Sequence, residues 1–105
     1  MKLICDVCGS ENVCMSAQIA WDFDNNCWKS NRGEEWITFE MKDDKLVEVD
    51  RKGFNGLSQQ DIIKNIKSNI NDFDIDFGCD ECEEIVNPEY DGLTDEIEIF
   101  NKLTQ

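Results

Sequence analysis

Apolar residues occupy every second position from Val13 to Phe23, and mostly polar residues stand between them. A period of two over this length is typical of a β-strand with one buried face. Asp24-Asn25-Asn26 follows, and these residue types tolerate left-handed backbone and favour turns. We therefore expect a strand over 13–23 and a hairpin that returns over residues 27–30.

Two more strands are expected over residues 36–41 and 46–49, with a polar turn at 42–45 between them. Residues 51–56 contain two glycines and are predicted to form a loop. Trp21 and Trp36 fall in apolar alternation and are expected in the core. Trp28 is the tryptophan expected at the surface.

Isoleucines at 62, 63, 66 and 70 recur at helical spacing, which predicts the main helix over residues 58–71. Ser58 can accept a hydrogen bond from the first turn, and Asp61 stands three residues later, as in a capping box with a shorter acid. The apolar stripe of this helix is interpreted as core packing.

Phe73, Ile75 and Phe77 alternate with aspartates, so a strand over 72–77 should bury its aromatic side and expose its acidic side. Near the C-terminus, Thr94 could cap a short helix. The apolar residues that would lie on one side of this helix are Leu93, Ile97, Phe100 and Leu103. Residues 96–99 also alternate, so a strand remains an alternative there. Together the patterns predict a single α+β domain over 1–105, with a small antiparallel sheet packed on the main helix.

Two Cys-x-x-Cys pairs, which we call the knuckles, lie far apart in the sequence: Cys5 with Cys8, and Cys79 with Cys82. Each such turn aims two sulfurs at one point, and two turns together make the tetrahedral four-thiolate cage that suits zinc. Iron, held as in rubredoxin, is the main rival metal. Free thiols in the core, or a disulfide within one pair, are the alternatives without a metal. A closed four-sulfur shell leaves no position for substrate, so catalysis at the metal is not expected.

The long segment between the knuckles implies that its strands and helix are either an insertion or the body of the domain. The two remaining thiols, Cys14 and Cys27, are too distant in the expected hairpin register to bridge. Cys14 lies close enough to the first knuckle to be a substitute ligand, but a half-buried structural thiol is the preferred interpretation. The spacing of Asp72, Asp74 and Asp76 superficially resembles a calcium loop, but apolar residues alternate with them, which favours an exposed strand face.

The chain has 24 acidic against 10 basic residues and a formal net charge of −14. Such a surface repels nucleic-acid phosphates and favours association with a basic protein. The sequence contains no His, which excludes Cys-His zinc sites and Ser-His-Asp triads. We see no export signal and no membrane span, and we therefore expect a cytoplasmic protein.

Three groups of residues resemble a group of small uncharacterised bacterial and phage zinc-ribbon proteins: Cys5-Asp6-Val7-Cys8-Gly9-Ser10, then Ala20-Trp21-Asp22-Phe23 with Asn26 and Trp28, and finally Cys79 to Cys82. The resemblance covers the knuckles and the first hairpin. It implies a metal-stabilised β-ribbon and no established activity. Residues 33–78 depart from it, because they are longer and carry a helix.

The function favoured by these observations is that of an intracellular binding module with a structural zinc and no enzymatic activity. Its acidic residues would contact a basic protein surface: Asp72, Asp74, Asp76, Glu83 and Glu84. Electron transfer by a rubredoxin-like iron centre is one alternative. Inhibition of a nucleic-acid enzyme by an acidic surface that mimics DNA is another. The pattern does not indicate an oligomeric state.

Overall fold

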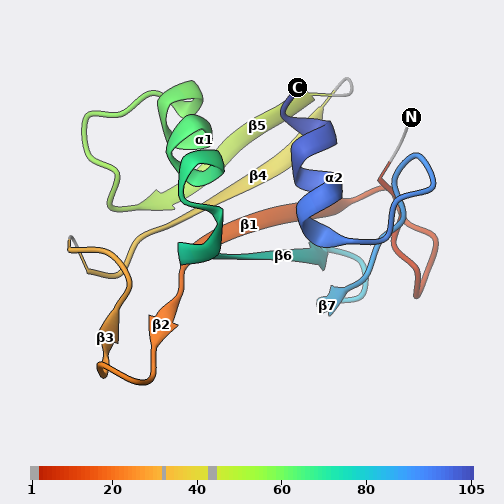
Figure 1. Cartoon of the computed structure of the whole chain (residues 1–105). Helices are drawn as coiled ribbons and strands as arrows, with labels where there is room; N and C mark the ends of the chain where they lie inside the picture. Colours follow the sequence, from red (N-terminus) through yellow and green to blue (C-terminus); the bar gives the residue numbers. More distant parts are fainter. Residues whose placement is uncertain (1–2, 32, 43–44) are drawn as a thin grey trace.

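A five-stranded antiparallel sheet with both helices on one face forms the body of the protein (Figure 1). The structure is a computed structural model and describes residues 3–31, 33–42 and 45–105. The strand order is β5-β4-β1-β6-β7. The bounds are β1 Val13–Ile19, β4 Trp36–Lys42, β5 Lys45–Lys52, β6 Phe73–Cys79, β7 Glu84–Val86, α1 Gln59–Ser68 and α2 Glu96–Leu103. The predicted α+β architecture with an antiparallel sheet is confirmed.

The core lies between the sheet and the two helices. Alternate residues of the central strands are buried toward the helices: Val13, Met15, Ala17 and Ile19 of β1, Ile37 and Phe39 of β4, and Phe73, Ile75 and Phe77 of β6. Ile62 and Ile66 of α1 and Ile99 and Phe100 of α2 are buried against them. The other sheet face carries neither helix, and we call it the open face. It includes Ser16, Thr38, Asp74 and Asp76.

The predicted strand over 13–23 is interrupted at Ala20. Its N–H donates to the Asp72 carbonyl at 2.9 Å, and its carbonyl accepts from Lys29 at 3.0 Å. The chain then forms a separate two-stranded hairpin, β2 Trp21–Asp22 with β3 Cys27–Trp28. Phe23 lies beyond this pairing and is 87% exposed, so its expected place on the buried face is wrong. The predicted turn at 24–26 is confirmed.

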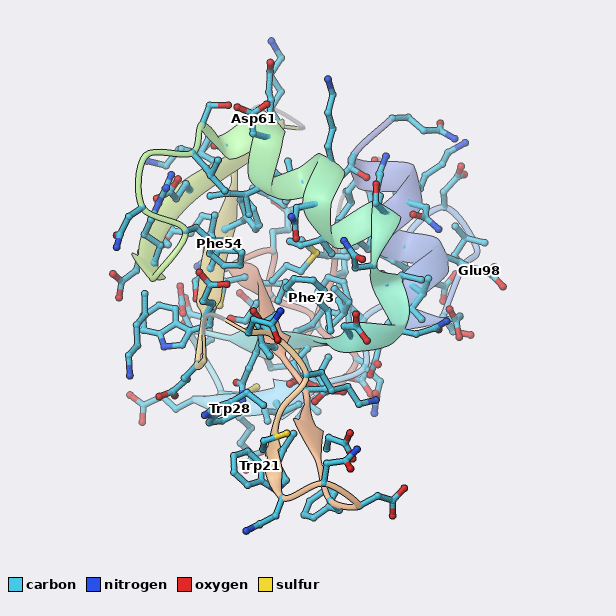
Figure 2. The ribbon with its side chains drawn as sticks, turned by 60° about the vertical axis from the view of Figure 1, so that its left-hand side comes forward. Trp21, Trp28, Phe54, Asp61, Phe73 and Glu98 are labelled. Atoms are coloured by element: carbon cyan, nitrogen blue, oxygen red, sulfur yellow. The ribbon has the colours of Figure 1, made fainter. Side chains whose placement is uncertain are left out.

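The expected core positions of Trp21 and Trp36 are wrong, because both are half-buried, and Trp28 is less exposed than expected. Trp21 and Trp28 meet edge to face in the hairpin, with ring centroids 4.9 Å apart, and Figure 2 shows them together. Trp28 packs against the hydrophobic core, and it is only partly exposed. Side chains of successive residues in β4 alternate between the two faces of the sheet. Ile37 and Phe39 face the core, so Trp36 lies on the open face and is half-buried rather than buried.

Strand β5 extends through Arg51 and Lys52, where a loop was predicted. The Arg51 guanidinium donates to the Glu48 carboxylate and to two carbonyls of the following loop, Phe54 at 3.0 Å and Leu57 at 2.8 Å. These bonds hold the loop against the strand. The predicted turn at 42–45 includes residues 43 and 44, which lie outside the described residues.

Glu35 is a buried carboxylate that sequence reasoning did not single out. It is 3% exposed, and its Oε2 accepts a hydrogen bond from the Phe54 N–H at 2.8 Å. Gly53 makes room for it, because a Cβ at that position would lie 2.5 Å from Glu35 Cγ. Gly53 also has a φ of +79°, in the region that only glycine adopts freely. Phe54 then stacks on Phe73, with ring centroids 6.4 Å apart (Figure 2).

Helix α1 is capped as predicted, since the Ser58 side chain accepts from the Asp61 N–H at 3.2 Å. It ends at Ser68, and a 3₁₀ turn over Ile70–Asp72 leads directly into β6.

The C-terminal segment is a helix, as preferred, and Leu93, Phe100 and Leu103 contact the core as predicted, but the cap and the place of Ile97 differ from the prediction. Asp95, not Thr94, caps α2 by accepting from the Glu98 N–H at 3.0 Å. Ile99 and Phe100 face the core, whereas Ile97 is 42% exposed. Two residues along a helix rotate by about 200°, so a helix that buries Ile99 must turn Ile97 outward.

Candidate metal centre

The two knuckles meet because β1 and β6 are antiparallel neighbours. Val13 at the start of β1 lies opposite Cys79 at the end of β6. The first knuckle lies shortly before β1, and the second begins at the last residue of β6, so both lie at the same end of the sheet (Figure 1). The Asp80 N–H continues this pairing by donating to the Asn12 carbonyl at 3.0 Å.

Each knuckle closes on a residue with positive φ immediately after its second cysteine. Gly9 follows Cys8 with a φ of +73°, and its N–H donates to the Cys5 carbonyl at 3.0 Å. Glu83 follows Cys82 with a φ of +56°, and its N–H donates to the Cys79 carbonyl at 2.8 Å. The two turns therefore use the same backbone reversal, although only the first has glycine where the left-handed conformation favours it.

The four predicted sulfurs converge. The Sγ atoms of Cys5, Cys8, Cys79 and Cys82 all lie within 4.8 Å of one another. Cys5 Sγ is 3.8 Å from Cys82 Sγ, and Cys8 Sγ is 3.6 Å from Cys79 Sγ. A tetrahedral site with metal–sulfur bonds of about 2.3 Å has sulfur–sulfur edges of about 3.8 Å. The cluster therefore has the donor set and spacing of a four-thiolate metal site, and all four cysteines are free thiols.

Burial divides the cluster into an inner and an outer half. Cys5 and Cys79 are each 2% exposed, whereas Cys82 is half-buried and Cys8 is exposed. Burial opposes ionisation of Cys5, but hydrogen bonds from the backbone of Cys8 and Val7 outweigh it and lower the pKa to about 7. The pKa of Cys82 is raised, first by its hydrogen bond with Cys8 and then by burial. Four adjacent thiolates repel one another, so a bound dication is what would allow all four to ionise together.

One acidic side chain of each knuckle is bonded to a segment far from it in the sequence. The Asn12 amide donates to the Glu81 carboxylate at 2.8 Å, so the segment after the first knuckle binds the second. Asp6 Oδ1 in turn accepts from the Asn87 N–H at 3.2 Å. Sequence reasoning missed these links, because nothing in the local pattern pairs residues about 70–80 positions apart. They anchor two of the acidic side chains that crowd the site.

Cys14 and Cys27 lie outside the four-sulfur cluster. Cys14 is half-buried on β1, as expected, and its thiol donates to the Gly78 carbonyl at 3.6 Å. Burial, followed by the charge of Asp80, raises its pKa, which keeps it a neutral thiol. Cys27 is exposed in the hairpin. Neither forms a disulfide, in agreement with the sequence prediction.

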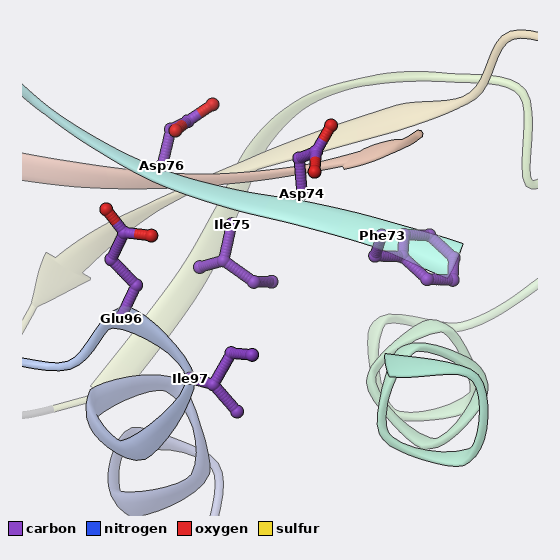
Figure 3. A pocket seen from close by; sticks show the side chains of 6 residues that line it. All are labelled: Phe73, Asp74, Ile75, Asp76, Glu96 and Ile97. Carbon is purple, nitrogen blue, oxygen red and sulfur yellow. The ribbon is translucent and has the colours of Figure 1, made fainter. Parts of the chain in front are cut away.

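The five acidic residues proposed as a contact face lie in three places. Asp74 and Asp76 project side by side from the open face of β6 (Figure 3). Asp72 lies in the 3₁₀ turn, half-buried, and Glu83 and Glu84 belong to the second knuckle and the start of β7. The alternation of exposed aspartates and buried apolar residues in β6 confirms a strand rather than a calcium loop.

No protein-family model, curated protein or solved structure matches this chain. The resemblance to small zinc-ribbon proteins therefore stays an expectation from the sequence. Among the described residues, no helix has both the length and the apolar character needed to cross a membrane.

Proposed function

We propose that this chain is a small intracellular zinc-binding protein in which the metal is structural and the acidic surface binds a partner protein. The observation that carries the proposal is the convergence of four cysteine sulfurs at tetrahedral spacing. With four protein thiolates the metal has a full shell and no position for water or substrate. The metal would then stabilise the folded chain and take no part in a reaction.

The position of the site supports a structural role. Cys8 and Cys79 are 71 residues apart in sequence, and the metal would join the segment before β1 to the segment after β6. For a chain of 105 residues, whose core is small, such a cross-link adds substantially to stability. The net charge of −14 supports a basic partner and disfavours direct binding of nucleic acid.

Iron remains the second candidate, because the same four-thiolate tetrahedron also holds a single iron. That metal would make the protein an electron carrier. A red preparation with visible sulfur-to-iron absorption supports this function, and a colourless one that contains zinc excludes it.

Metal analysis of the freshly purified protein tests the proposal. We expect about one zinc per chain in the wild type, and loss of that zinc in Cys79→Ser. Cys27→Ser is the matched control, because it removes an exposed thiol outside the cluster and should keep the metal. A wild-type protein without metal, or a Cys79→Ser variant that retains it fully, contradicts the proposed site.

A further inference from the structure

One edge of β6 is paired over only part of its length. β6 pairs with β1 along its whole length, Phe73 to Cys79, but with β7 only over Phe77–Cys79. Within the described part of the chain, residues 73–76 therefore have no strand on their second side. A strand edge of this kind presents main-chain donors and acceptors to another chain.

The alternation of hydrogen bonds along β1 and β6 shows which main-chain groups of β6 face its open edge, the side of residues 73–76 that carries no strand. The bonds from Ala20 to Asp72 and from Asp80 to Asn12 mark both ends of the β1–β6 ladder. Bonded and non-bonded pairs alternate in an antiparallel ladder, so Asp74 and Asp76 direct their main-chain groups to β1. Phe73 and Ile75 direct theirs outward. The Phe73 N–H is bonded to the Ile70 carbonyl, which leaves the Phe73 carbonyl and both groups of Ile75 at the edge.

A groove of about 320 Å³ runs beside this edge, between β6 and α2. Figure 3 shows Asp74 and Asp76 directed away from the helices, and Glu96 and Ile97 of α2 below the strand. A strand added here would place alternate side chains beside the two aspartates and the intervening ones over Ile97. Ile97 is an apolar side chain that α2 leaves 42% exposed.

The charge of the groove selects the occupant. Its three ionisable side chains, Asp74, Asp76 and Glu96, are all carboxylates. Partial burial raises the pKa of Glu96, and the charges of Asp76, Asp95 and Asp74 raise it further. A second copy of this chain would bring the same aspartates against like charge, which disfavours self-association along the edge.

We propose that the open edge of β6 binds an extended basic segment of a partner protein as an added strand. Lysine or arginine at alternate positions would pair with Asp74 and Asp76, and small apolar residues between them would cover Ile97. Main-chain bonds to Ile75 would provide affinity, and the alternating side chains would provide specificity. This inference rests on the proposed function, because it assigns the place and the chemistry of the acidic contact.

A short peptide of alternating lysine and valine, blocked at both ends, is the probe. Fluorescence anisotropy should show binding to the metal-loaded protein, and N-methylation of alternate peptide groups should weaken it roughly tenfold, because the main-chain donors are lost. Hydrogen exchange gives a local readout: the Ile75 amide should exchange faster than those of Asp74 and Asp76 in the free protein. It should become protected when the peptide binds.

The double variant Asp74→Asn with Asp76→Asn should bind the peptide roughly tenfold more weakly, because two exposed ion pairs are lost. Asp24→Asn with Asp61→Asn is the control, because it removes the same charge at two exposed positions outside the groove and should change binding little. Equal losses in both double variants, an unaffected N-methylated peptide, or no binding at all would overturn the edge proposal. Metal content measured on the same samples keeps these outcomes separate from failure of the metal site.

Discussion

Removal of the metal from the four-cysteine cluster is expected to destabilise the fold by about 4 kcal/mol, in the chain-entropy treatment of cross-links. The folded chain already holds both knuckles together, but the unfolded chain must close a loop between Cys8 and Cys79, 71 residues apart, before four sulfurs can share one ion. The metal therefore prefers the folded chain by the entropy of that closure. Against a typical domain stability of about 5–15 kcal/mol, the loss is large.

Urea unfolding followed by tryptophan fluorescence measures this loss directly. Protein saturated with zinc is compared with protein treated with a chelator, both under reducing conditions so that disulfides cannot replace the metal. With the usual urea dependence for small proteins, the midpoint should fall by roughly 2 M. The Cys27→Ser variant should show the same fall as the wild type.

An unchanged midpoint, in samples whose metal loss has been verified, would refute the reasoning. It would mean that protein contacts alone hold the knuckles, such as those from Asn12 to Glu81 and from Asp6 to Asn87. By linkage, it would also mean that the unfolded chain binds the metal as tightly as the folded chain does.

Two further predictions concern the body of the domain. Gly53→Ala should destabilise the protein by about 1–3 kcal/mol more than Gly56→Ala in the same urea assay. Both glycines have positive φ, but only at Gly53 would a Cβ meet Glu35, at 2.5 Å, so equal losses would contradict the close packing. The second prediction is a pH dependence, because the hydrogen bond and charge of Arg51 lower the pKa of Glu48. The stability from this pair is present above the ordinary glutamate pKa and lost as the pH falls through the lowered one. Glu48→Gln should therefore cost about 0.5–1 kcal/mol at neutral pH and little in acid, and a difference that persists in acid would contradict this.

The local elements could be read from the sequence because they depend on residues near one another. The alternation in 13–19 and 73–77 predicts two of the central strands, and the isoleucine spacing with Ser58 predicts α1. The two Cys-x-x-Cys turns likewise give the four candidate ligands. In each case the periodicity of a strand or helix, or the geometry of one turn, is visible within a few residues.

The tertiary structure alone decided how these pieces meet. Whether the knuckles share one ion depends on the register that sets Val13 opposite Cys79, and no local pattern fixes a pairing over that distance. The phase of α2, which buries Ile99 and exposes Ile97, depends on packing against β6. The free edge beside Ile75 exists because β7 pairs with only the end of β6. Sequence periodicity specifies which side of an element is apolar, but long-range packing determines what that side contacts and which edges remain open.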